Sequence, residues 1–299
     1  MWLLLAFCSA TLLGFYDVSK KQALKDNAVL PVLLLNTLFS SLLFLPIILS
    51  SIGGWGWFSS TPFHCSTGDL YAHGLVVIKS CIVLSSWIFG YFALKHLPLT
   101  IVGPINATRP VMVLVGAMLI YGERLNAYQW VGVLLAIISL FLLSLSSRKE
   151  GVDFRKNVWI LMLGAAAVLG AVSGLYDKFI SRQLEPMFVQ SWYTLYQFAM
   201  MAVTVAILWI PRRKKTTPFH WSWAIPLISI FLSAADLCYF FALSHDDAMI
   251  SVVSMIRRGS VVVSFMFAAL LFKERNLSAK IIDLILILIG MVFLWMGSM

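Results

Sequence analysis

Long apolar runs separated by short polar breaks dominate this chain. With about 20 apolar residues per membrane span, the pattern predicts helices near residues 2–20, 29–51, 70–94, 98–121, 127–146, 157–179, 187–210, 223–244, 247–272 and 277–297. The breaks between these runs carry lysines, prolines and glycines, which are typical of loops. The predicted fold class is therefore an all-α integral membrane protein with ten transmembrane helices.

Short segments of the first half recur in the second half in the same order. A charged loop at 147–156 divides the chain into a first unit, 1–146, and a second unit, 157–299. An odd number of spans per unit gives the two units opposite orientations, which predicts inverted repeats around a central cavity. The matched segments are Gly14-Phe15-Tyr16-Asp17 with Gly174-Leu175-Tyr176-Asp177, Ala93-Leu94-Lys95-His96 with Ala242-Leu243-Ser244-His245, and Arg109 with Arg258.

The composition excludes an ordinary soluble domain, because 61% of the 299 residues are hydrophobic and only 12% are charged. The formal charge of +9 comes from lysines and arginines that gather in the loops after helices 1, 3, 5, 7 and 9. By the positive-inside rule those loops are cytosolic and both termini are non-cytosolic. We therefore expect a protein of the bacterial cytoplasmic membrane and exclude nucleic acid as a partner.

Three arginines inside apolar spans are the sharpest chemical signal. Arg109 interrupts the fourth span, and Arg257 and Arg258 interrupt the ninth. A charged residue at the centre of a membrane helix costs about 2.5–3.5 kcal/mol or more, so these side chains should face protein, water or a ligand. Neighbouring helical residues point about 100° apart, so we assign Arg258 to the cavity and expect Arg257 to meet a carboxylate or carbonyl. A purely structural role in salt bridges is the alternative.

Acidic side chains within the spans add candidates for coupling or gating. Asp17 and Asp177, each preceded by a tyrosine (Tyr16 and Tyr176), occupy equivalent places late in helices 1 and 6. A carboxylate in a partly dry pathway can exchange a proton during transport. For Asp17 the alternative is an ordinary helix-surface ion pair with a lysine one turn further on.

Two further charges, Lys79 and Asp236, have no charged equivalent in the other repeat. Because the shared fold cannot require an asymmetric charge, we assign both to solute or ion binding, with simple pairing to a cavity charge as the alternative. Aromatic residues form the rest of the expected binding wall, against the commoner possibility of buried packing. They are Trp87, Tyr91, Tyr193, Tyr196 and Tyr239.

The chain resembles the drug/metabolite transporter superfamily, in particular its ten-helix members with two EamA-type domains. The resemblance rests on the five-plus-five architecture and on two segments, Pro110 to Leu125 and Ser260 to Leu277, which end in Gly122-Glu123-Arg124 and Lys273-Glu274-Arg275. It implies a secondary transporter in which helices 1–4 and 6–9 surround a central cavity while helices 5 and 10 stand outside it.

We accordingly expect a transporter that moves a small polar or amphipathic, anionic or zwitterionic organic solute by alternating access. Proton coupling and a homodimeric state are left open. The alternatives are a flippase for a lipid-linked headgroup and, from another class, a membrane enzyme or sensor. An enzyme has no motif support, because the sequence holds no Walker loop, GxSxG elbow or HExxH, and the four cysteines have no metal-like spacing. No cofactor or metal is expected.

Overall fold

The computed structural model describes residues 1–58, 60–96, 105–106, 108–145, 158–215, 217–260, 262–263, 266 and 277–298. Every regular element in these residues is a helix. The first repeat contributes α1 (Trp2–Leu24), α2 (Val29–Ile52), α3 (Leu70–His96), α5 (Arg109–Tyr121) and α6 (Ala127–Leu145). The second contributes α7 (Val158–Ser181), α8 (Pro186–Leu208), the 3-10 helix η1 (Ile210–Lys215), α9 (Ala224–Leu243), α10 (Ile250–Arg258) and α12 (Leu277–Met296).

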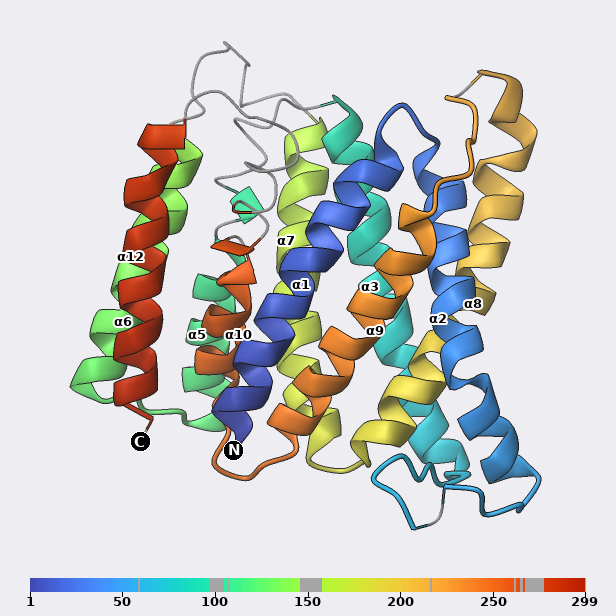
Figure 1. Ribbon diagram of the computed structural model, residues 1–299, viewed down its shortest axis with the longest axis horizontal. Helices are drawn as coiled ribbons and strands as arrows, with labels where there is room; N and C mark the ends of the chain where they lie inside the picture. The colour runs from blue at the N-terminus through green and yellow to red at the C-terminus, as the bar shows by residue number, and fades with distance from the viewer. Residues whose placement is uncertain are drawn as a thin grey trace.

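Within the described residues, six helices are long and apolar enough to cross a membrane: α1, α2, α3, α7, α8 and α9. Shorter apolar stretches, Arg109–Tyr121, Ala127–Ser139 and Ile285–Met296, lie in α5, α6 and α12. The two termini lie at the same end of the bundle (Figure 1). The all-α membrane architecture predicted from the apolar runs is thereby confirmed.

The fourth and ninth spans differ from the continuous helices predicted. In the fourth, Thr108 is a turn residue and α5 begins at Arg109, so this arginine starts a helix instead of lying in the middle of one. Pro110 cannot donate a backbone hydrogen bond to the preceding turn, which favours a break at this place. In the ninth span α10 ends at Arg258, followed by a turn at Gly259. Residues 98–104 and 107 of the fourth predicted span, and residues 261, 264–265 and 267–272 of the ninth, lie outside the described part of the chain.

Helices of one repeat pack mainly against helices of the other. The sequence match makes α1 equivalent to α7, α2 to α8 and α3 to α9, and the contacts follow that equivalence. The α1–α9 contact recurs as its symmetry mate α3–α7, while α2 packs on α8, α5 on α10 and α6 on α12. A pseudo-two-fold axis between the repeats produces this pattern. Rotation about it exchanges the α1–α9 and α3–α7 contacts and leaves the α2–α8, α5–α10 and α6–α12 contacts in place.

The α6–α12 pair stands at one edge of the bundle (Figure 1). Its helices meet backbone to backbone: a Cβ added to Gly132 would lie 2.7 Å from the carbonyl oxygen of Gly290. Small residues permit this close approach between membrane helices.

Glu123, from the Gly-Glu-Arg signature of the first repeat, caps a helix of the second. Its Oε1 accepts from the backbone N–H of Ile250 (2.7 Å), and its Oε2 accepts from the N–H of Ser251 (3.1 Å) and from the Ser251 hydroxyl. The buried Lys178 Nζ donates to the carbonyl of Ala248 (2.5 Å) just before that helix. Glu123 thereby pairs two of the otherwise unpaired N–H groups at the start of α10, and with Lys178 it fixes the start of the helix that carries Arg257 and Arg258.

Candidate functional site

A cavity of about 310 Å³ lies between the two repeats. Its walls come from α1, α3, α5, α7, α8, α9 and α10, and none of its lining residues belongs to α6 or α12. Four basic and three acidic side chains line it, which leaves one net positive charge. They are Lys79, Arg109, Arg257, Arg258, Asp17, Asp177 and Asp236. The charges scattered through the spans are thus brought to one place by the packing of the helices.

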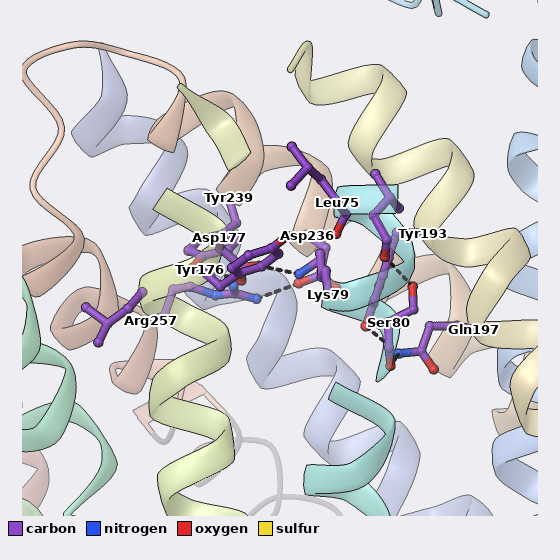
Figure 2. A network of polar contacts seen from close by, with 12 residues as sticks. Leu75, Lys79, Ser80, Tyr176, Asp177, Tyr193, Gln197, Asp236, Tyr239 and Arg257 are labelled. Carbon is purple, nitrogen blue, oxygen red and sulfur yellow. Dashed lines mark hydrogen bonds and ion pairs between the residues drawn. The ribbon is translucent and has the colours of Figure 1, made fainter. Parts of the chain in front are cut away.

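Lys79 and Asp177 form a buried ion pair between α3 and α7 (Figure 2). The side chains are only 4% and 8% exposed. The ammonium also lies over the rings of Tyr193 (4.6 Å) and Phe240 (4.8 Å), whose faces attract a cation. This environment compensates the lysine charge without any solute.

A second pair joins Arg257 to Asp236, with Nη2 and Oδ1 2.7 Å apart. The guanidinium lies 4.1 Å from the centre of the Tyr239 ring, and the Tyr239 hydroxyl donates to Asp177 Oδ2 at 3.2 Å. Tyr239 therefore links the two ion pairs into one network across α3, α7, α9 and α10 (Figure 2). The asymmetric charges Lys79 and Asp236 each find a partner of opposite sign in this network.

Arg109, Arg258 and Asp17 complete the charged lining. Within the part of the chain that the structure describes, neither Arg109 nor Arg258 has a carboxylate within ion-pair distance. The Arg109 guanidinium lies against Gly170, where an added Cβ would overlap it, and its Nε has no hydrogen-bond partner among the described residues. Asp17 interacts with Lys20, Arg258 and Ser260. The three groups leave a positively charged part of the cavity wall.

The other sequence candidates divide into cavity and packing residues. Tyr16, Trp87, Tyr193 and Tyr239 line the cavity. Tyr176 does not, because its hydroxyl donates to the carbonyl of Leu75 (3.1 Å) between α7 and α3.

Tyr196 also lies elsewhere: its hydroxyl is 2.9 Å from Nδ1 of His73, and its ring stacks on Trp192. The side chain of Tyr91 falls outside the described residues. Neither Tyr176 nor Tyr196 is among the lining residues, because helix rotation and the partner helix decide where an aromatic ring points. Their expected roles in gating and solute binding stay predictions.

Sequence reasoning missed several polar residues of the wall. Ser254 and Ser260 line the cavity on either side of the arginine pair, and Ser173 lines it from α7. Ser254 could have been found, because it precedes Arg258 by one helical turn and shares its face. In the described residues no group of three or more His, Cys, Asp or Glu side chains is placed to hold a metal ion.

Comparison with known proteins agrees with this architecture. A family model for the EamA-like transporter family matches the chain twice, over residues 1–145 and 157–296. A solved structure described as "Crystal structure of protein" superposes with a TM-score of 0.70, at 18% identity, over 98% of this chain and 95% of that one. No curated protein sequence matches at a significant level. With nearly its whole length covered by two matches, the chain belongs to the EamA-like transporter family, within the drug/metabolite transporter superfamily.

Proposed function

We propose that the chain is a secondary transporter for a small organic anion or zwitterion, with the central cavity as the solute site and Arg109 and Arg258 as the groups that bind the anionic end. One observation carries this proposal. Among the described residues, Lys79 and Arg257 form ion pairs with carboxylates, whereas neither Arg109 nor Arg258 has a carboxylate within ion-pair distance.

The charge balance favours an anionic solute. Each intramembrane arginine costs about 2.5–3.5 kcal/mol or more, and Asp17 is the one carboxylate of the wall outside the two ion pairs. A carboxylate or phosphate would neutralise the remaining charge, and the planar guanidinium suits both because it binds them through two parallel hydrogen bonds. Arg109 also starts α5, whose positive helix end favours an anion at the same place.

The symmetry of the packing supports alternating access. The α1–α9 and α3–α7 contacts are equivalent under the repeat. If one contact opens while the other closes, the cavity faces the other side of the membrane. The volume of about 310 Å³ is at the lower end of the usual range for small-molecule sites. We therefore infer a small solute. No feature of the described residues favours the flippase.

Transport in proteoliposomes tests the role of the arginines. Carboxylate and phosphate-ester metabolites are first screened by thermal shift, since a solute that binds the native state raises its melting temperature. Uptake of each hit is then measured for wild type, Arg109→Ala, Arg258→Ala and the control Arg212→Ala, which removes an exposed arginine on η1. We expect the first two variants to lose uptake and the control to keep it. Full uptake by both cavity variants in folded form would end the proposal.

We further propose that Asp17 carries a proton in exchange for the solute. In the same proposal, the loops rich in lysine and arginine lie in the cytosol and both termini lie on the other side of the membrane. Asp17 lies in the cavity wall beside Arg258, so the Asp17 carboxylate and an anionic solute compete for the same guanidinium. Vesicles loaded with a pH-sensitive dye should change internal pH during wild-type transport and not with Asp17→Asn. Unchanged proton movement in that variant would assign coupling elsewhere.

A further inference from the structure

A second, smaller space adjoins the cavity between α2, α3, α8 and α9. It measures about 20 Å³ and shares Trp87, Tyr193, Leu232 and Asp236 with the cavity wall. We call it the polar chamber, because its other described lining residues all carry amides or hydroxyls. These are Asn36, Thr37, Ser40, Gln190, Thr194, Gln197 and Ser233.

Three buried oxygens around the polar chamber have no hydrogen-bond partner among the described residues. They are Oε1 of Gln190, Oε1 of Gln197 and Oγ of Ser233. The three residues are 1%, 2% and 4% exposed. Buried polar atoms in native proteins are nearly always paired, so unpaired atoms gathered around one space indicate an occupant.

The Gln197 amide shows what kind of occupant is needed. Its Nε2 donates to the backbone carbonyl of Ser80 (3.2 Å), which can only accept, and it lies 3.3 Å from the Tyr193 hydroxyl. The nitrogen must therefore face Ser80, and the opposite atom is the acceptor oxygen. Thr37 and Thr194 donate their hydroxyl hydrogens to carbonyls of their own helices, so they too offer only acceptors to the chamber. These acceptors call for a hydrogen-bond donor, while the unpaired Ser233 hydroxyl can either donate or accept.

We propose that the polar chamber is a subsite that takes a terminal hydroxyl or amino group of the transported solute, while the anionic end of the same molecule binds Arg109 and Arg258. The proposal deepens the transporter function and rests on it. The volume suits one such group, because a single water needs about 10–15 Å³ on the same measure. Asp236 at the junction of chamber and cavity carries a carboxylate that would repel a second anionic group.

Matched probes separate the two ends of the solute. The purified protein is titrated, with thermal shift as the readout, with straight-chain carboxylates from propionate to hexanoate and with their ω-hydroxy and ω-amino derivatives. We expect at least one derivative to bind about tenfold more tightly than the plain carboxylate of the same length, the gain from one or two hydrogen bonds to buried acceptors. Whether the hydroxy or the amino derivatives bind more tightly then shows which of the two groups, hydroxyl or amino, the polar chamber takes.

Variants assign the preference to the chamber. Gln190→Leu and Ser233→Ala remove unpaired oxygens and should reduce the tenfold preference to near one, leaving plain carboxylates unaffected. The matched control is Ser41→Ala, a buried serine of α2 outside the chamber whose hydroxyl donates to its own helix. It should leave the preference unchanged.

Four outcomes would overturn the subsite. Equal binding of plain and donor-bearing carboxylates, with Arg258→Ala abolishing both, refutes the subsite and leaves the transporter intact. A preference that survives in Gln190→Leu and Ser233→Ala places the donor elsewhere. A variant that only lowers the melting temperature of the unliganded protein shows that the chamber holds a structural water. If no probe binds at all, the anion site and the subsite fail together.

Discussion

The buried pair of Lys79 and Asp177 allows a quantitative test of the electrostatic network. Removing one partner of a buried ion pair leaves an uncompensated charge and typically costs about 3–5 kcal/mol. Lys79→Met leaves Asp177 with the hydroxyl of Tyr239, and Asp177→Asn leaves the ammonium over the rings of Tyr193 and Phe240. Because those rings offset up to about 2 kcal/mol, Asp177→Asn should lie at the low end of the range.

The double variant Lys79→Met/Asp177→Asn removes both charges and should be within about 1–2 kcal/mol of wild type, since neutral replacements of buried pairs are often nearly neutral. The free energy of unfolding is measured by titrating detergent-solubilised protein with sodium dodecyl sulfate. Arg212→Met on the exposed surface should change it by less than about 0.5 kcal/mol. The expected coupling energy, the sum of the two single costs minus the cost of the double variant, is thus about 4 kcal/mol or more. Additive costs in the double variant would show that the two side chains do not interact.

Two local predictions and one pH-dependent prediction follow from the same geometry. Gly170→Ala should displace the Arg109 guanidinium and reduce solute uptake at least tenfold, whereas Gly164→Ala on the same helix, with open space around its Cβ, should leave uptake unchanged; equal uptake by the two variants would contradict the placement of Arg109. Glu123→Ala should lower the free energy of unfolding by about 1–2 kcal/mol, because α10 loses its N-terminal cap; no change in a denaturation titration would argue against that role. Burial raises the pKa of the Cys65 thiol, in the loop before α3, to about 11, so alkylation of a variant that keeps only this cysteine should be slow at neutral pH and accelerate up to that pH; fast labelling at pH 7 would refute its burial.

The sequence by itself determined the architecture and showed which charges lie within the apolar runs. Apolar runs of bilayer length can only be helices, because lipid offers no partner for unpaired backbone groups, and the recurrence of Arg109 as Arg258 indicated the duplication. Glu123 was recognisable as part of a signature, although the helix that it caps lies 127 residues further along the chain. The residues around Glu123 in the sequence do not show which distant helix it contacts.

Only the tertiary structure decided which charges are compensated. Lys79 and Asp236 are equally isolated in the sequence, yet one pairs with Asp177 and the other with Arg257. The broken fourth span and the packing positions of Tyr176 and Tyr196 likewise depend on neighbouring helices. Charge pairing depends on distance in space and on helix rotation, which a membrane helix acquires by packing against other helices, because its lipid-facing and protein-facing residues are both apolar.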